Sequence, residues 1–247
     1  MTFLEAAQYA QGAYRPSPGG RYVRDLYDRR RDTRVLCTFV PETQTLVIAF
    51  RGTASLRNWW GVNFLVRPRE GVHRGIFAAV NVHEKELMKC LVTFPFARLV
   101  IVGHSLGGAL ANEFARRCHD MGYRQTTVVT FGAVRAHRKR WVRMTGMGWR
   151  TVQVINNNDV VSRLLGVTYS HIGRLLYFDR HGRHHRHMPL LVRLWDRIAG
   201  RLRGGIFDGV TDHGMDDYVR NCAALDMTVE SYVDPLHSGR PPKPLDR

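Results

Sequence analysis

The sequence of 247 residues has few cysteines, little lysine and no long run of apolar residues. Its cysteines are dispersed and form no C-x-x-C pair, which argues against a disulfide framework and against a zinc site. No stretch approaches the roughly 18 consecutive apolar residues of a membrane-spanning helix. The first residues also lack the basic start and apolar centre of a signal peptide. We therefore expect a cytoplasmic or membrane-peripheral protein, or a secreted one if a leader precedes the given sequence.

Basic residues strongly outnumber acidic ones. Lysine and arginine number 37 against 21 acidic residues, a formal net charge of +16, and only four of the basic residues are lysine. Such basicity favours acidic partners, either anionic lipid headgroups or nucleic acid. The sequence contains no RNA-binding aromatic motif and no zinc-finger spacing, so we expect no nucleic-acid partner. Peripheral contact with an anionic membrane surface is one explanation, and the amino-acid usage of the source is the other.

Strands and helices are predicted to alternate along most of the chain. Helical patterns cover residues 3–10, 75–90 and 106–121, and a further helix is expected after His213, running to about residue 224. Apolar strands are expected at 35–40, 45–50, 99–102, 126–131 and 151–155. This order indicates an α/β fold with a mostly parallel central sheet and helices on both faces. With 44% hydrophobic residues, we expect one domain over residues 1–237 and a disordered tail at 238–247.

The most informative stretch is Gly-His-Ser-Leu-Gly at residues 103–107, between a predicted strand and a predicted helix. A strand–turn–helix of this kind is a nucleophile elbow, in which the serine stands on a tight, strained turn. Gly103 and Gly107 leave the space that the turn requires. The alternative is an ordinary turn whose serine only caps the helix. We consider Ser105 the candidate nucleophile.

Three other strand or loop ends carry candidate partners for this serine, because ligands bind beyond the carboxyl ends of parallel strands. Thr53 follows a strand and could form an oxyanion hole with the backbone N–H of Leu106. Asp159 follows the strand that ends near residue 155, and His213 precedes a helix. Each has a structural alternative as a turn or capping residue. The order Ser105, Asp159, His213 is nevertheless that of nucleophile, acid and base in the α/β-hydrolases.

Several motifs together resemble the class 3 (fungal-type) lipases, over about residues 35 to 225. The matching segments are Phe50-Arg51-Gly52-Thr53 with Arg57-Asn58-Trp59, Val72-His73-Arg74-Gly75-Ile76-Phe77, Gly103 to Ala109, Thr130-Phe131-Gly132, Asp159-Val160-Val161, His171-Ile172-Gly173 and Asp212-His213. The resemblance implies a Ser105/Asp159/His213 triad, an oxyanion hole at Thr53 and Leu106, and ester hydrolysis without a metal or other cofactor. The sequence departs from the family at Ser162, where the family usually has proline, and in lacking the disulfide frame of secreted fungal members.

Two further segments are interpreted through this resemblance. In the family, the segment after the oxyanion residue is a mobile lid, expected here at residues 54–72. Its apolar side chains would be either a substrate-contacting stripe or part of a fixed core: Leu56, Trp59, Trp60 and Phe64. Residues 174–205 are expected to be a basic amphipathic insertion, which would lie either in a membrane interface or on the sheet. Four histidines at 181–187 are interleaved with arginine, which disfavours a metal site there.

The sequence thus predicts a serine hydrolase, a lipase or carboxylesterase that acts on acylglycerol-type lipids. Two alternatives stay open: a phospholipase for anionic lipids, and a membrane-binding relative of the hydrolases without turnover. The sequence leaves open the preferred acyl chain, the preferred headgroup and the oligomeric state.

Overall fold

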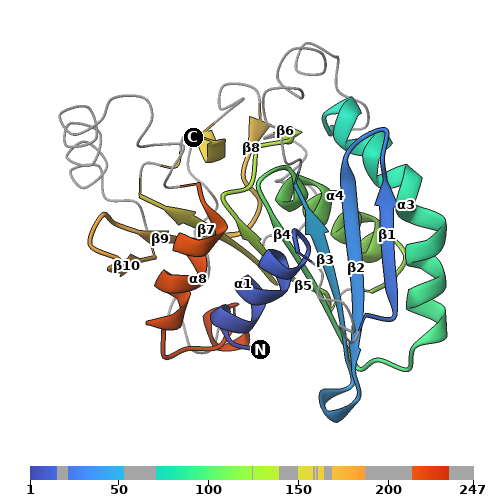
Figure 1. Ribbon diagram of the computed structural model, residues 1–247, viewed down its shortest axis with the longest axis horizontal. Coiled ribbons are helices and arrows are strands. Elements are labelled where there is room, and N and C mark those ends of the chain that lie inside the picture. The colour runs from blue at the N-terminus through green and yellow to red at the C-terminus, as the bar shows by residue number, and fades with distance from the viewer. Residues whose placement is uncertain are drawn as a thin grey trace.

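A computed structural model describes residues 1–15, 22–52, 71–123, 125–138, 150–157, 159, 161–163, 169–186 and 213–233. Its centre is an eight-stranded sheet in the order β1-β2-β3-β4-β5-β7-β9-β10 (Figure 1). The strands of this sheet are β1 (Arg24–Asp28), β2 (Thr33–Val40), β3 (Thr45–Arg51), β4 (Arg98–His104), β5 (Thr127–Phe131), β7 (Thr151–Asn156), β9 (Arg174–Phe178) and β10 (His184–His185). The five strands from β3 to β9 pair in parallel, and the outer strands pair antiparallel. The predicted mostly parallel sheet is therefore present.

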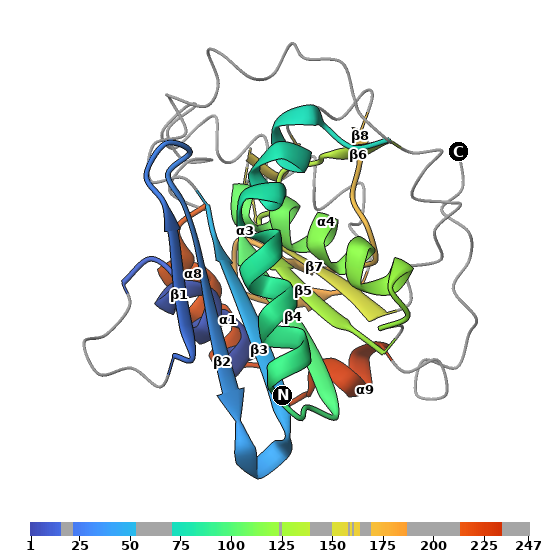
Figure 2. The ribbon, with the colours of Figure 1, turned by 90° about the vertical axis from the view of Figure 1, so that its right-hand side faces the viewer.

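Helices cover both faces of this sheet. The described helices are α1 (Phe3–Gly12), α3 (Arg74–Thr93), α4 (Leu106–Asp120), α8 (Met215–Ala223) and α9 (Val229–Val233), with short 3-10 turns η1 (Pro41–Thr43) and η3 (Val161–Arg163). Helices α3 and α4 lie on one face, and α1 and α8 lie side by side on the other (Figure 2). A small second sheet pairs β6 (His137–Arg138) with β8 (Tyr169–Ser170).

Alternating side chains of the strands build two separate apolar cores. In β3, Ile48 and Phe50 pack toward α3 and α4, whereas Val47 and Ala49 pack toward α1 and α8. Strand residues point to opposite faces in turn, so a strand covered on both faces reads as one continuous apolar run. This explains why β3, β4, β5 and β7 were predictable from apolar runs alone.

The helix expected at the N-terminus is confirmed, and its start is set by a capping box. The Thr2 hydroxyl accepts from the Glu5 N–H at 3.1 Å, and the Glu5 carboxylate accepts from the Thr2 N–H at 2.7 Å. Each of these bonds satisfies an N–H that the first turn would otherwise leave free. At the other end of this helix, Tyr14 directly follows the C-cap residue Ala13.

Two of the longer strands, β1 and β9, were not predicted, and neither were the two-residue strands β6, β8 and β10. Strand β1 lies in a highly charged stretch, where arginine and aspartate alternate with only a few apolar residues. Strand β9 falls at the start of the predicted insertion 174–205, yet it pairs in parallel with β7 inside the central sheet. The insertion therefore does not begin at Arg174, because the apolar run Leu175–Phe178 belongs to the sheet. Residues 187–205, residues 54–70 of the lid predicted at 54–72, and the tail at 238–247 lie outside the described residues.

All four cysteines are buried and free, in keeping with the reduced, packed thiols expected from their spacing. Among the described helices, none combines the length and the apolar composition needed to cross a bilayer. The carboxyl ends of β3, β4, β5 and β7 meet at one edge of the sheet, because these strands run in parallel. That edge is where the candidate residues are expected.

Candidate active site

Ser105 lies between β4 and α4 in a strained backbone conformation. Its φ is 58° and its ψ is −127°. A side chain held in this sparsely populated region costs about 1–3 kcal/mol, so the surrounding structure must impose it. The Ser105 N–H donates to the Phe131 carbonyl oxygen of β5 at 2.9 Å, and the Ser105 carbonyl oxygen accepts from Gly108 at 3.1 Å. The local geometry is that of the predicted nucleophile elbow.

The elbow depends on close contact between α4 and the end of β3. A Cβ atom at Gly107 would lie only 2.2 Å from the Phe50 carbonyl oxygen, so no larger residue fits there. The same approach brings Gly52, at the end of β3, beside the serine: a Cβ atom at Gly52 would lie 3.1 Å from the Ser105 Cβ. The start of α4 and the end of β3 therefore meet at the serine.

Leu106 is the first residue of α4 and is buried. The first four N–H groups of a helix have no intrahelical acceptor, and the helix dipole favours negative charge near them. The Leu106 N–H thus belongs to a helix N-terminus that begins next to the Ser105 side chain. Its predicted oxyanion partner, Thr53, lies outside the described residues, as do the predicted lid residues Leu56, Trp59, Trp60 and Phe64.

Asp159 and His213 are in direct contact, although 54 positions separate them. His213 Nδ1 lies 2.9 Å from Asp159 Oδ2. A carboxylate only accepts hydrogen bonds, so Nδ1 carries the hydrogen and Nε2 is left as the basic nitrogen. Asp159 is fully buried and the His213 side chain nearly so. This is the orientation that a carboxylate gives to a catalytic imidazole.

The buried Asp159 carboxylate accepts further hydrogen bonds from three donors. The Tyr218 hydroxyl of α8 donates to Oδ2 at 2.6 Å, and the backbone N–H groups of Val161 and Ser162 donate to Oδ1 at 2.9 and 3.2 Å. A buried charge of this kind requires such partners, because an unpaired carboxylate away from water is very costly. The role of Tyr218 could not be read from the sequence, since only the fold shows that α8 passes over Asp159.

Ser162 supports the turn that holds Asp159. Its hydroxyl donates to the Asp159 carbonyl oxygen at 2.8 Å, in addition to the backbone bond already described. Proline, the usual family residue at this position, could make neither bond because it has no N–H and no hydroxyl. His171, in another of the recognised motifs, also hydrogen-bonds the Ser162 backbone; burial and nearby Arg135 lower the pKa of His171 to about 3. Ser162, which stands where the family usually has proline, thus makes hydrogen bonds that proline could not make.

Gly132 brings the pair and the serine to one place. It directly follows Phe131, the residue whose carbonyl oxygen accepts from the Ser105 N–H. It has a positive φ of 52°, and a Cβ atom there would lie 2.4 Å from Asp159 Oδ2 and 2.9 Å from His213 Nδ1. The His213 ring also packs at 4.5 Å, centroid to centroid, from the ring of His104, the neighbour of Ser105. The three predicted residues therefore share the predicted edge of the sheet.

One contact is not made in this structure. Within the described part of the chain, Ser105 Oγ and His213 Nε2 are both buried and neither has a hydrogen-bond partner. Hydrogen bonds between nucleophile and base are often long or poorly aligned without substrate and tighten only in the complex. A hydroxyl oxygen and an imidazole nitrogen are thus buried here without partners among the described residues.

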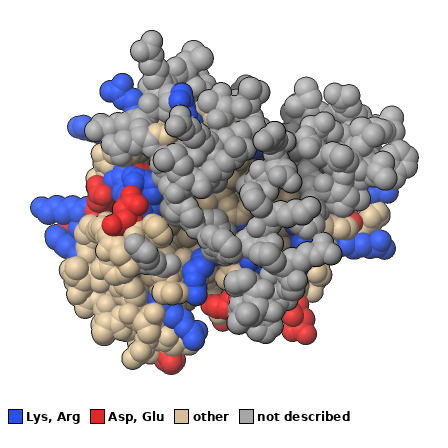
Figure 3. Space-filling model, turned by 180° about the vertical axis from the view of Figure 1, so that it is seen from behind, with Lys and Arg blue, Asp and Glu red and all other residues tan. Residues whose placement is uncertain are grey.

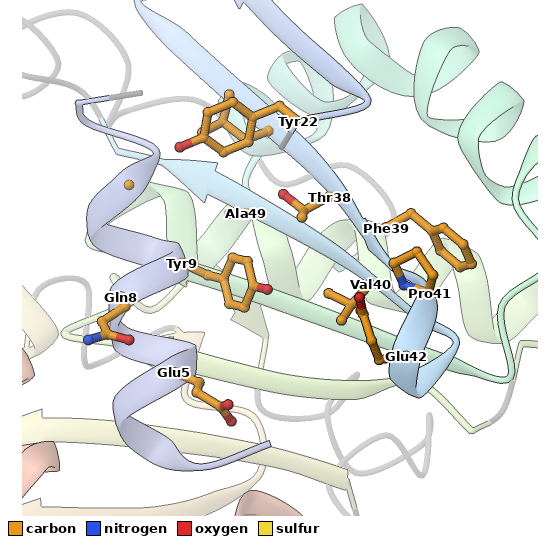
Figure 4. Close-up of a pocket in the computed structure, with 12 residues that line it drawn as sticks. Glu5, Gln8, Tyr9, Tyr22, Thr38, Phe39, Val40, Pro41, Glu42 and Ala49 are labelled. Carbon is orange, nitrogen blue, oxygen red and sulfur yellow. The ribbon is translucent and has the colours of Figure 1, made fainter. Parts of the chain in front are cut away.

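A separate cavity of about 420 Å³ lies away from these residues, between α1 and strands β2 and β3 (Figure 4). Tyr22 lies at one end of it, Glu5 and Glu42 lie at the other, and Tyr9 projects from α1 between them. None of its lining residues was a candidate from the sequence. In the described ranges, no three His, Cys, Asp or Glu side chains are grouped so as to hold a metal ion.

Comparison with known proteins identifies the class. Residues 47–169 match the family model for Lipase (class 3). The secreted mono- and diacylglycerol lipase A of Penicillium cyclopium is 27% identical over 139 residues, covering 51% of this chain and 46% of that protein. The triacylglycerol lipase OBL1 of Arabidopsis thaliana is 26% identical over 199 residues, covering 61% of this chain and 38% of that protein. These matches therefore span less than half the length of either relative.

Solved structures give the same fold. A Rhizomucor miehei lipase in its propeptide complex superposes with a TM-score of 0.65 at 19% identity, covering 73% of this chain and 69% of that one. A lipase from Rhizopus microsporus var. chinensis superposes with a TM-score of 0.60 at 20% identity, covering 70% of this chain and 72% of that one. The fold is thus that of the α/β-hydrolases, as predicted. The chain belongs to the class 3 lipase family.

Proposed function

We propose that this chain is a serine-dependent carboxylic ester hydrolase that acts on acylglycerol-type lipids, a lipase or carboxylesterase. The observation that carries the proposal is the buried His213–Asp159 pair beside a serine in a strained elbow. Unactivated serine is a poor nucleophile and needs an adjacent base. The names of the relatives, mono- and diacylglycerol lipase and triacylglycerol lipase, support an acylglycerol substrate.

In the proposed reaction, Ser105 Oγ attacks the ester carbonyl carbon while His213 Nε2 takes the hydroxyl proton. Asp159 holds the imidazole through Nδ1 and stabilises its positive charge. The Leu106 N–H at the start of α4, with Thr53, stabilises the tetrahedral oxyanion. His213 then returns the proton to the leaving alcohol. Water, activated by the same imidazole, attacks the acyl-serine and releases the carboxylic acid.

The test is hydrolysis of p-nitrophenyl acyl esters by the wild-type chain and by Ser105→Ala. We expect the variant to lose hydrolysis while keeping its circular dichroism spectrum and melting temperature. The small change of one hydroxyl to hydrogen leaves the elbow packing intact. Full residual activity in Ser105→Ala would refute the proposal, and so would a wild-type chain that cleaves no ester at any chain length.

A second candidate, phospholipase activity on anionic lipids, is favoured by the net charge of +16. On the face shown in Figure 3, however, the described lysine and arginine side chains lie in separate groups, several of them beside acidic ones. Among the described residues, Arg31 pairs with Asp28, and Arg34 pairs with Asp25. Comparing turnover of triolein emulsions with that of phosphatidylglycerol vesicles separates the two activities. Faster cleavage of the vesicles would favour the phospholipase.

A further inference from the structure

His104 is a buried polar residue that the proposed chemistry does not use. It ends β4 directly before Ser105 and is only 5% exposed. Three rings surround its own: His213 at 4.5 Å with an interplanar angle of 30°, Tyr14 at 5.6 Å and Tyr218 at 5.8 Å. A buried imidazole among aromatic rings is costly unless both of its nitrogens are satisfied.

Both nitrogens of His104 are satisfied, and the partners fix its tautomer. Nε2 lies 2.8 Å from the backbone carbonyl oxygen of His213. A carbonyl oxygen can only accept, so Nε2 carries the hydrogen. Nδ1 of the neutral ring is then an acceptor, and the Tyr14 hydroxyl, 2.8 Å away, donates to it. Burial, and secondly the neighbouring His213, lower the pKa of His104 well below its ordinary value of 6.5, in agreement with a neutral ring.

Tyr14 extends this connection to the end of β3. Its hydroxyl also hydrogen-bonds the backbone of Gly52. A Cβ atom at Gly52 would lie 2.9 Å from the Tyr14 hydroxyl and 2.9 Å from the His104 carbonyl oxygen, so the three segments are in close contact. The hydrogen bonds therefore run from the Gly52 turn through Tyr14 and His104 to the backbone of His213.

This path joins three parts of the chain that are distant in sequence: the Gly52 turn, the end of β4 and the loop that carries His213. Gly52 directly precedes Thr53, the predicted oxyanion residue, and His213 is the proposed base. Reacting groups must be held to within a few tenths of an ångström of productive geometry for full rate. The neutral state of His104 matters as well, because a second positive charge 4.5 Å from the His213 ring would oppose the imidazolium that forms during the reaction.

We propose that His104 and Tyr14 are positioning residues, which hold the His213 backbone and the Gly52 turn in register with Ser105. The inference rests on the proposed ester hydrolysis and adds to it two residues that touch neither the substrate nor the reacting atoms. If the two residues were purely structural, replacing them would lower the stability of the fold alone. If they are positioning residues, replacing them also lowers the rate of the chemical step.

The first experiment measures kcat and KM for p-nitrophenyl butyrate, below its solubility limit, in His104→Phe and Tyr14→Phe. Phenylalanine keeps a ring in each place and removes the hydrogen bonds. We expect kcat to fall about 10-fold to 100-fold with KM within about 2-fold, because the lost contacts orient the base and not the ester. His104→Gln keeps a donor that can reach the His213 carbonyl oxygen, so we expect it to recover part of the lost kcat.

The matched controls are His83→Phe and Tyr9→Phe. His83 is also buried and hydrogen-bonded, to the Thr33 hydroxyl at 2.9 Å, but it lies on α3 over the other face of the sheet. Tyr9 lies on α1, the helix that Tyr14 follows, and its hydroxyl lies at the cavity of Figure 4. Both controls should keep kcat within about 2-fold of wild type, even where the melting temperature falls.

The outcomes separate the inference from the proposed function. A wild-type rate in His104→Phe, or an equal loss of kcat in His83→Phe, overturns the positioning role and leaves ester hydrolysis standing. A wild-type chain that neither cleaves esters nor reacts with a fluorophosphonate overturns the proposed function. A second measurement does not depend on activity: nitrogen-15 NMR should show His104 as the neutral Nε2–H tautomer at pH 6 to 8. A protonated ring or the Nδ1–H tautomer contradicts the inference.

Discussion

The Tyr218 hydroxyl donates to the same oxygen of Asp159 that accepts from His213, at 2.6 Å and 2.9 Å respectively. The hydroxyl in turn accepts from the Asn156 N–H at 3.1 Å. Helix α8 is thereby tied to the end of β7 directly over the carboxylate. Two donors on one carboxylate oxygen fix its position more firmly than one, and that position sets the orientation of the His213 ring.

Tyr218→Phe should accordingly weaken both the fold and the reaction. The variant leaves the ring in place but removes a charge-assisted hydrogen bond to a buried carboxylate, worth about 1.5–3 kcal/mol. We expect urea unfolding to show a loss of this size and kcat/KM to fall about 10-fold. Tyr232→Phe is the control, because the Tyr232 hydroxyl donates to a backbone oxygen, that of Leu175, at 2.6 Å. It should lose stability while keeping kcat/KM.

Gly132→Ala should abolish activity through a steric effect on the acid–base pair. The added methyl group would lie 2.4 Å from Asp159 Oδ2, so the carboxylate or the histidine must move. We expect hydrolysis to fall by at least about 100-fold, the scale of a displaced catalytic group. Gly122→Ala is the matched control: its φ of 96° is also positive, but nothing lies within 4 Å of the new methyl group. It should cost about 1 kcal/mol of stability and no activity. Equal effects of the two substitutions would show that backbone strain, and not crowding, is responsible.

The buried carboxylate of Glu113 on α4 makes the stability depend on pH. Burial by itself would raise the pKa of Glu113, but the nearby His137 ring, 3.7 Å from the carboxylate, and hydrogen bonds from Arg116 more than offset it and lower the pKa to about 2. A carboxyl whose pKa is lower in the folded state stabilises the fold above its unfolded pKa of about 4.5. This contribution, about 3 kcal/mol, is lost as the pH falls from 4.5 toward 2.

Urea unfolding of wild type and Glu113→Gln at pH 7 and at pH 3 measures this contribution. The wild-type chain should lose more free energy of unfolding than the variant between the two pH values, because only the wild type carries the titrating carboxyl. Parallel losses in the two proteins would exclude Glu113 as the source.

Ser162→Ala and Ser162→Pro test the turn that carries Asp159. Alanine removes the hydroxyl that donates to the Asp159 carbonyl oxygen, and proline removes in addition the N–H that donates to Oδ1. We expect kcat/KM to fall by about 3-fold to 10-fold in the alanine variant and further in the proline variant. If proline, the usual family residue, restores or raises activity, these bonds are dispensable.

Much of the fold could be predicted from local patterns. The strands β3, β4, β5 and β7 are covered on both faces and therefore appear as short apolar runs, and the helix at 75–90 shows its buried stripe of Ile76, Val80, His83 and Leu87. Strand β1 was missed because its exposed edge is mostly charged, and β9 because arginines flank its four apolar residues. In both cases the partner strand, and not the local composition, decides the structure.

The candidate site could be predicted only where a role leaves a local pattern. The elbow does so, because a strained serine needs small neighbours. The supporting contacts do not: Tyr14 lies 90 positions before His104, and Tyr218 lies 59 positions after Asp159. A tyrosine is an ordinary residue in either place, and only the folded chain shows which polar atoms its hydroxyl reaches. The roles of Thr53 and the lid residues stay predictions.

The most direct test of the account is covalent labelling with a fluorophosphonate, followed by mass-spectrometric mapping of the modified residue. We expect one adduct per chain, on Ser105, formed at a rate that falls by about 10⁴-fold in Asp159→Asn and at least as far in His213→Ala, because the serine loses its correctly oriented base. An adduct on another residue, or an unchanged labelling rate in His213→Ala, would contradict the account.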